Sequence, residues 1–250
     1  MDSLKLRITH QTPEPVEDRP EGLVWIEQGP QRAVLLTPDE IDDTKTYPLI
    51  TLLHGAGRQD ELLLKGCKGE PERRQAFFLI PRSLHMTWDL IALGMAGGAS
   101  LDPAAGQAAS DRPDLDFLEY AYDLIWRRFP IDADRQALLG YSDGASYGLG
   151  VGLSNPHVFS AVMAWAAGFL AIDGNAIPAG ARKPPVYLEY GTHDELFDFE
   201  QVAKPMQRNL EELGYDVSFH ADQGGRHWPS STFQEEALDW LFGEHWQPRN

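Results

Sequence analysis

Ser142 has the surroundings of a nucleophile. Residues 138–148 read LLGYSDGASYG, so an apolar run stops at Gly140, and Ser142 stands between Gly140 and Gly144 in the pattern G-x-S-x-G. A buried strand before this pattern and a helix of small residues after it are the setting in which a serine occupies a tight strand-to-helix turn. Side chains at the two glycines would collide with neighbouring elements, and the start of the helix places a positive dipole near the Ser142 hydroxyl. The pattern predicts that Ser142 attacks carbonyl carbons; the alternative is a plain turn between a strand and a helix.

An attacking serine needs a general base, and the base needs an acid that orients it. Where G-x-S-x-G forms such a turn, the acid and then the histidine follow the serine along the chain. Asp194 comes shortly after the apolar run 185–191, at the carboxyl end of a predicted strand, where open α/β sheets hold their sites. We expect Asp194 to be the orienting acid. Glu195 and Asp198 are its rivals, and capping the next helix is the alternative role for Asp194.

His227 is the expected general base. It lies in the glycine-rich stretch QGGRHWP, after a predicted strand at 217–220 and before the last predicted helix. Two other histidines fit less well. His220 lies inside a strand, and the side chain of His193 points away from that of Asp194 because adjacent strand residues face opposite sides. The histidines that we assign to the surface are His10, His157 and His245.

A tetrahedral intermediate carries a negative oxygen that needs backbone donors, which form an oxyanion hole. Residues 54–57, HGAG, end the most apolar run of the chain, and we expect the amide of Ala56 to supply one donor. The second donor is the amide of Asp143, the residue after the serine. His54 is expected to hold this loop. A carboxylate beside the oxyanion is unfavourable, so the Asp143 side chain should turn away from Ser142 and be bonded elsewhere.

The elements that must position these residues follow from the apolar pattern. Near-continuous apolar runs predict strands buried on both faces, and apolar residues three and four apart predict helices. The predicted strands lie at 23–26, 33–36, 48–54, 76–80, 137–140, 159–165, 185–191 and 217–220, and the predicted helices at 115–129, 144–153, 199–213 and 233–246. Strands that alternate with helices indicate an α/β fold with a mostly parallel central sheet and helices on both faces.

We expect one domain over residues 1–250. Residues 1–20 are polar and contain prolines, which predicts an extended lead-in, and the first two strands should form a hairpin. Residues 82–113 are rich in Gly, Ala and Ser and have little periodicity, so we expect an irregular excursion there. Excursions of that length inside a compact domain are usually functional.

Taken together, four motifs resemble the α/β-hydrolase superfamily, and more narrowly its small serine esterases of the phospholipase/carboxylesterase and polyhydroxybutyrate-depolymerase/feruloyl-esterase-like groups. The motifs lie at 54–57, 140–144, 191–194 and 225–228, and the resemblance covers about residues 22–246. It implies the α/β-hydrolase fold and hydrolysis of small carboxylic esters through an acyl-enzyme, with no metal or cofactor. Asp143 departs from the pattern, because relatives commonly carry a neutral residue there.

Composition narrows the classes of function. The formal net charge of −17 argues against binding to nucleic acid or anionic lipid, which leaves a small-molecule ester as the expected partner. The single cysteine, Cys67, allows no intrachain disulfide, and no base is placed beside it that would make it a nucleophile. We see no signal peptide and no apolar run long enough to span a membrane, so cytoplasmic residence is the expectation. The oligomeric state stays open.

The same three residues would also serve a thioesterase, a peptidase or a polyester depolymerase, and the fold alone would suit a non-catalytic binding protein. A comparison of ester and amide rates separates the enzymes, and fluorophosphonate labelling separates an enzyme from a binding protein. Several large apolar residues near the predicted strand ends could line a pocket, although each is more often ordinary core: Met86, Trp88, Leu90, Trp165, Phe169, Leu196, Phe197 and Trp228.

Overall fold

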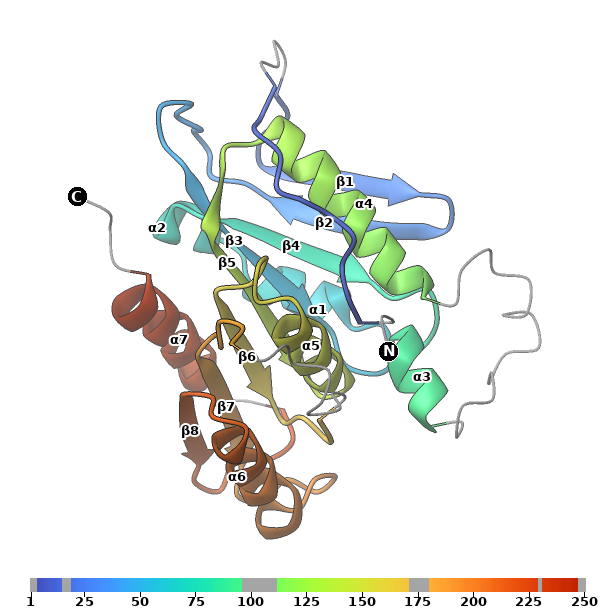
Figure 1. The fold of residues 1–250 in the computed structure, drawn as a ribbon, viewed down its shortest axis with the longest axis vertical. Coiled ribbons are helices and arrows are strands. Elements are labelled where there is room, and N and C mark those ends of the chain that lie inside the picture. The colour runs from blue at the N-terminus through green and yellow to red at the C-terminus, as the bar shows by residue number, and fades with distance from the viewer. Residues whose placement is uncertain (1–3, 15–18, 96–111, 171–179, 229–230, 247–250) are drawn as a thin grey trace.

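A central sheet organises the chain. The computed structural model describes residues 4–14, 19–95, 112–170, 180–228 and 231–246 (Figure 1). Within them, eight strands form one sheet in the order β1-β2-β4-β3-β5-β6-β7-β8. The strands are β1 Leu23–Gln28, β2 Gln31–Leu36, β3 Tyr47–Leu53, β4 Phe77–Arg82, β5 Ile131–Tyr141, β6 Ala161–Trp165, β7 Val186–Gly191 and β8 Val217–Asp222. The β1–β2 hairpin pairs antiparallel with β4, and every pairing from β4 to β8 is parallel, which confirms the predicted mostly parallel sheet.

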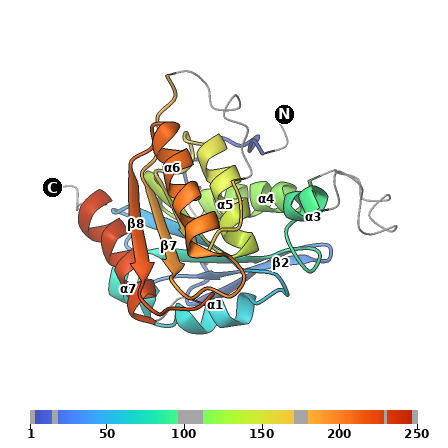
Figure 2. The same cartoon turned by 90° about the horizontal axis from the view of Figure 1, so that it is seen from below.

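Helices cover both faces of the sheet, as predicted. Figure 2 shows α4, α5 and α6 on one face, and α1 and α7 on the other. The described helices are α1 Asp60–Gly66, α2 Glu70–Arg74, α3 Asp89–Met95, α4 Pro113–Arg128, α5 Asp143–Ser154, α6 Lys204–Glu212 and α7 Ser231–Trp240, with single π-helical stretches η3 Phe199–Ala203 and η4 Leu241–His245. Successive residues of β3 therefore enter different cores: Leu49 packs with α4 residues and Ile50 with α1 and α7 residues.

Two expectations about the segments between strands need correction. The pattern predicted no helix between β3 and β4, yet α1 and α2 lie there. They are short, and Gly66, Gly69 and Pro71 in and around them gave the sequence the character of a loop. The excursion expected at 82–113 is not irregular throughout, because α3 occupies Asp89–Met95 and α4 begins at Pro113. Residues 96–111 of that excursion lie outside the described residues.

The lead-in is attached to the helical face by backbone hydrogen bonds. The amide of Leu6 donates to Oδ1 of the fully buried Asn155 (2.8 Å), and Nδ2 of Asn155 donates to the carbonyl of Leu4 (2.7 Å). Farther along, the amide of Glu14 donates to the carbonyl of Arg127 (2.8 Å). The described part of the lead-in thus runs from the end of α5 to the end of α4.

Helix α5 approaches the sheet so closely that two positions have no room for a side chain. A Cβ at Gly140 would lie 2.1 Å from the carbonyl oxygen of Gly144. A Cβ at Gly144 would lie 2.3 Å from the carbonyl oxygen of Leu53 in β3. Both obstacles are backbone atoms, so no rotamer change relieves the overlap. The two glycines of G-x-S-x-G therefore allow the start of α5 to touch β5 and β3.

Two buried carboxylates join the starts of α3 and α4. Oδ2 of Asp89 accepts from the amide of Asp114, and Oδ2 of Asp114 accepts from the amide of Asp89, both at 2.9 Å. Oδ1 of Asp114 also accepts from the amide of Leu84 (2.7 Å), which holds the segment that follows β4. Burial raises the pKa of Asp89 to about 6, and burial together with the Asp89 charge raises the pKa of Asp114 to about 7.

The carboxylate pair predicts a pH-dependent term in stability. Because both pKa values are raised in the folded state, the native protein binds more protons than the unfolded chain between about pH 4 and pH 7. The contribution of the pair is therefore most favourable below about pH 4 and is lost as the pH rises to 7. Asp89→Asn removes one of the two charges. The free energy of unfolding of this variant minus that of the wild type should therefore increase by at least about 1 kcal/mol as the pH rises from 4 to 7. Urea unfolding at several pH values measures this difference; the exposed Asp123→Asn on α4 is the control, and an equal trend in both variants would contradict the prediction.

The close approach of α5 predicts different costs for two glycine substitutions on the same helix. Gly144→Ala places a methyl group on the backbone of β3 and should destabilise the fold by about 3 kcal/mol or more. Gly148→Ala meets only a methyl group of Leu53 at 3.3 Å and gains helix propensity, so it should change stability by about 1 kcal/mol or less. Thermal or urea unfolding compares the two, and similar losses would show that the overlap at Gly144 is relieved cheaply.

Candidate active site

Ser142 lies on a strained turn between β5 and α5. Its backbone has φ +54° and ψ −116°, a conformation that non-glycine residues rarely adopt. The amide of Ser142 donates to the carbonyl of Trp165 in β6 (2.9 Å), and its carbonyl accepts from the amides of Ala145 and Ser146. These hydrogen bonds and the close packing at Gly140 and Gly144 keep the Ser142 backbone in its strained conformation. Ser142 is 8% exposed, so its hydroxyl stands in a largely desolvated setting.

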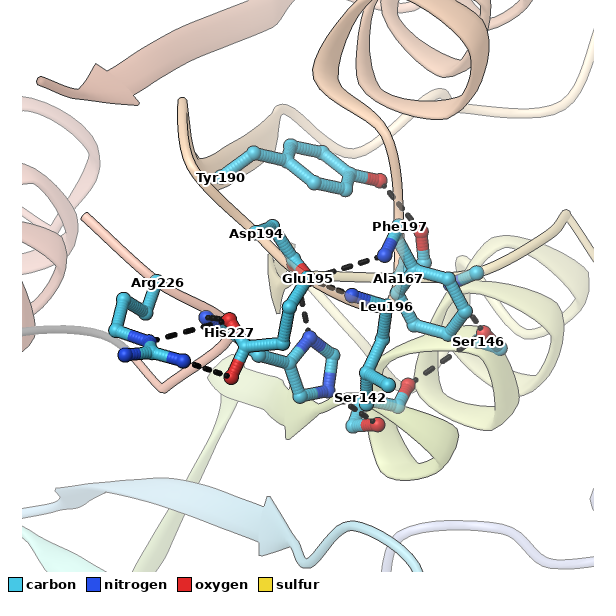
Figure 3. Close-up of polar contacts among 11 residues, drawn as sticks. Ser142, Ser146, Ala167, Tyr190, Asp194, Glu195, Leu196, Phe197, Arg226 and His227 are labelled. Carbon is cyan, nitrogen blue, oxygen red and sulfur yellow. Dashed lines mark hydrogen bonds and ion pairs between the residues drawn. The ribbon is translucent and has the colours of Figure 1, made fainter. Parts of the chain in front are cut away.

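The structure brings Ser142, His227 and Asp194 into one chain of hydrogen bonds (Figure 3). Nε2 of His227 lies 2.9 Å from Oγ of Ser142, and Nδ1 lies 2.8 Å from Oδ2 of Asp194. The side chain of Asp194 is fully buried, and that of His227 is 9% exposed. Because the carboxylate faces Nδ1, that nitrogen carries the imidazole proton, and Nε2 is left to accept from the serine hydroxyl.

Asp194 is fixed by the loop that carries it. Its Oδ1 accepts from the amides of Leu196 (2.8 Å) and Phe197 (2.9 Å), which leaves Oδ2 facing His227. The loops after β7 and β8 also bond to each other, for example from the amide of His193 to the carbonyl of Gly225 (2.8 Å). Asp194 does not cap the next helical stretch, which was its expected alternative role, because Asp198 is the N-cap of η3 and Asp194 Oδ1 bonds only to amides of its own loop.

The rivals of these residues are engaged elsewhere. Glu195 pairs with Arg226 (3.3 Å), and Oδ1 of Asp198 accepts from the first amides of η3. The ring of His220 stacks on Tyr187 with centroids 4.3 Å apart. Cys67 is buried, and burial raises the pKa of its thiol to about 12, so it is a protonated thiol and not a thiolate nucleophile.

The loop at 54–57 lies against the nucleophile. A Cβ at Gly55 would lie 3.0 Å from the ring of Tyr141 and 3.2 Å from Cβ of Ser142. His54 is fully buried; its Nε2 accepts from the amide of Ser83 (3.0 Å), and its Nδ1 donates to the carbonyl of Gly55 (2.6 Å). Burial lowers the pKa of His54, which keeps the ring neutral in this role. His54 holds the loop, as its position in the sequence suggested.

The two amides assigned to the oxyanion hole, those of Ala56 and Asp143, have no backbone acceptor outside the helices and strands in the described part of the chain. Asp143 begins α5, so its N–H has no partner within the helix. The Asp143 carboxylate accepts a 2.6 Å hydrogen bond from the hydroxyl of Thr87, which agrees with the expectation that it is bonded elsewhere. Sequence reasoning did not identify Thr87, because a lone threonine in an aperiodic segment carries no signal.

The eight apolar residues near the strand ends divide into three groups, of which one, Leu90 and Phe197, is half-buried. Trp88 and Trp165 are buried in the core. Four others are 39–67% exposed and form what we call the apolar rim: Met86, Phe169, Leu196 and Trp228. Two of them adjoin the candidate site, since the amide of Leu196 donates to Asp194 and Trp228 follows His227. The indole of Trp228 also packs on Tyr141 beside the nucleophile, with ring centroids 4.4 Å apart.

No group of three or more His, Cys, Asp or Glu side chains in the described part of the chain is arranged to hold a metal ion. No helix there is both long enough and apolar enough to cross a bilayer.

Comparison with known proteins places the fold. No protein-family model matches the chain, and no curated protein sequence matches it. Among solved structures, it is similar to esterase PE8, with 22% identity over 89% of this chain and 99% of that one, at a TM-score of 0.62. It is also similar to a ferulic acid esterase of the anaerobic fungus Anaeromyces mucronatus (16% identity, 91% and 94% covered, TM-score 0.61). A third is the fluorophosphonate-binding serine hydrolase FphF of Staphylococcus aureus (14% identity, 88% and 96% covered, TM-score 0.65). These likenesses, together with the eight-stranded sheet and its flanking helices, show that the described chain has the α/β-hydrolase fold.

Proposed function

We propose that this protein is a serine hydrolase that cleaves small carboxylic esters, with Ser142 as nucleophile, His227 as general base and Asp194 as orienting acid. One observation carries the proposal: hydrogen bonds of 2.9 Å and 2.8 Å join the serine hydroxyl, the imidazole and the carboxylate in a continuous chain. Its chemical meaning is that a proton can leave Ser142 for His227 while Asp194 stabilises the imidazolium. The esterase neighbours of the same fold support this choice among the functions that the fold serves.

The reaction divides into acylation and deacylation. Oγ of Ser142 attacks the ester carbonyl carbon while Nε2 of His227 takes the hydroxyl proton. The carbonyl oxygen becomes an oxyanion, which the amides of Ala56 and Asp143 hold. The intermediate collapses, the bond to the alcohol oxygen breaks, and the imidazolium gives its proton to the departing alcohol. Water then attacks the acyl-enzyme by the same route, again with His227 as base, and releases the carboxylic acid and free Ser142.

The surroundings of Ser142 favour a neutral ester with an apolar portion. The indole of Trp228 offers exposed hydrophobic surface on Tyr141, the residue before the nucleophile, and apolar groups gain free energy when they leave water for such a surface. The net charge of −17 disfavours anionic substrates. One neighbour of the same fold is a ferulic acid esterase in complex with ferulic acid, a small molecule with an aromatic ring. Thioesters, amides and polyesters are the alternatives on the same residues, and rates on matched ester, thioester and anilide substrates of one acyl group separate them.

Ser142→Ala should abolish turnover and leave the fold intact. We expect kcat to fall by about 10⁴-fold or more, because only binding and the oxyanion amides would remain. A fluorophosphonate probe should label the wild type and not this variant. Ser154→Ala, at the other end of α5, is the matched control and should keep both labelling and turnover. Turnover of Ser142→Ala within tenfold of wild type would contradict the assignment, and a folded wild type that the probe does not label would favour a binding protein.

Trp228 should contribute to the binding of longer acyl groups. In a series of p-nitrophenyl esters, kcat/KM of the wild type should rise from acetate to hexanoate, since each buried methylene contributes up to about 0.8 kcal/mol. Trp228→Ala should lower kcat/KM for hexanoate about tenfold and for acetate much less. Trp25→Ala on β1, at a tryptophan that is 50% exposed against 39% for Trp228, is the control and should leave both rates unchanged. Equal losses on both esters in Trp228→Ala would show that the indole supports the site in general and does not bind the acyl group.

A further inference from the structure

A hydrogen bond between distant segments lies next to the nucleophile. The hydroxyl of Thr87 donates to Oδ2 of Asp143 at 2.6 Å, across 56 positions of sequence. Asp143 immediately follows Ser142 and begins α5, whereas Thr87 lies between β4 and α3. Neither side chain belongs to the hydrogen-bonded chain of Ser142, His227 and Asp194, so the proposed proton transfers do not use this contact.

The residues on either side of Thr87 hold both ends of the loop that contains Ala56. The carbonyl of Met86 accepts from the amide of Gly57 (2.7 Å). The indole Nε1 of Trp88 donates to the carbonyl of His54 (2.8 Å). Ala56 lies between these two anchored positions, so the place of its amide depends on residues 86–88.

Further contacts make residues 83–88 a rigid support for that loop. The side chain of Arg58 donates to the carbonyls of Ser83, Leu84 and His85. The ring of Trp88 is sandwiched between His54 and Tyr147, with centroid distances of 4.7 Å and 5.1 Å. Displacement of Thr87 would therefore move the whole support.

The bond from Thr87 to Asp143 closes a ring of contacts around the oxyanion hole. Gly57 and His54, close to Ala56 on either side, are bonded to Met86 and Trp88, and the amide of Asp143 belongs to the first turn of α5. Thr87 links residues 86–88 to α5 through its hydrogen bond to the side chain of Asp143, whose amide is the second proposed donor. Backbone donors are effective only when their spacing fits the oxyanion, and loss of one donor typically costs 10²–10³-fold in kcat.

The same bond accounts for an acidic residue beside an oxyanion. The carboxylate of Asp143 stands at the positive end of α5 and receives the Thr87 hydroxyl, and both interactions stabilise its charge. The hydroxyl also fixes the side chain in one direction, toward residues 83–88. The acceptor is what the link requires, so an asparagine with its carbonyl oxygen toward Thr87 would preserve it.

We propose that Thr87 and the carboxylate of Asp143 are positioning residues that set the spacing between the two oxyanion amides. This inference rests on the proposed function, since it concerns the oxyanion hole of the same site. Removal of the link should weaken binding of the tetrahedral intermediate and spare binding of the planar ester, so kcat falls while KM is nearly constant.

The test compares two pairs of variants on one p-nitrophenyl ester. Thr87→Val removes the hydroxyl at nearly constant volume, and Thr87→Ser restores it. Asp143→Ala removes the acceptor, and Asp143→Asn restores one. We expect Thr87→Val and Asp143→Ala each to lower kcat about 10- to 100-fold with KM within about threefold of wild type. Thr87→Ser should keep most of the kcat that Thr87→Val loses, and Asp143→Asn should keep most of the kcat that Asp143→Ala loses. Affinity for a trifluoromethyl ketone that forms a tetrahedral adduct should fall in parallel with kcat.

The double variant Thr87→Val/Asp143→Ala tests whether the two side chains act as one link. Its kcat should lie within about threefold of the lower single variant, because the second change removes a bond that is already broken. Multiplied losses, or wild-type kcat in Thr87→Val with the melting temperature preserved, would overturn the inference. Should Thr87→Val unfold, Asp143→Ala examines the same bond from its other end. A wild type that neither hydrolyses esters nor reacts with fluorophosphonate would overturn the proposed function itself, whereas an active wild type with fully active variants overturns only the link.

Discussion

The contact of α5 with the sheet is the constraint on which the site depends. Backbone meets backbone where Gly140 faces Gly144 and Gly144 faces Leu53, and the Ser142 backbone must take a left-handed conformation for the chain to turn there. That cost is local, and it is balanced by the packing of a whole helix on the sheet. The turn raises the Ser142 hydroxyl above the carboxyl edge of β5, where loops from other strands can reach it. The strained backbone of Ser142 is thus part of what places its side chain at the end of the buried strand β5.

Parallel pairing explains why residues 85 positions apart can meet. The strands β3, β5, β7 and β8 all end at one edge of the sheet, so the loops that carry Ala56, Ser142, Asp194 and His227 emerge side by side. Each loop is then fixed by its neighbours: the loop after β7 bonds to the loop after β8, and the loop after β3 to residues 83–88. The sheet supplies coarse proximity, and these bonds between loops supply the final distances.

The sequence predicts this arrangement wherever a residue type has a local reason. Glycines at 140 and 144 and the nearly continuous apolar run of β3 signal backbone contact and burial on both faces, so the fold was predictable and is confirmed. The roles of Ser142, His227 and Asp194 stay predictions for experiment. Other features have no local signature. The short α1 and α2 depend on packing, and Trp88 and Trp228 are the same residue type, yet one is core and the other belongs to the apolar rim. The partner of Asp143 depends on the path of a segment without periodicity.

The electrostatics of Asp143, where relatives commonly carry a neutral residue, connect these observations. A carboxylate about 5 Å from an oxyanion opposes it by about 3 kcal/mol at an effective dielectric of about 20, enough to offset much of what one backbone donor contributes. The hydroxyl of Thr87 and the dipole of α5 both act on the Asp143 carboxylate before any substrate binds, and they hold it on the side of residues 83–88. Under the proposed mechanism, an acidic residue at this position is therefore compatible with an oxyanion hole, because its side chain is bonded to Thr87 and only its amide is needed as a donor.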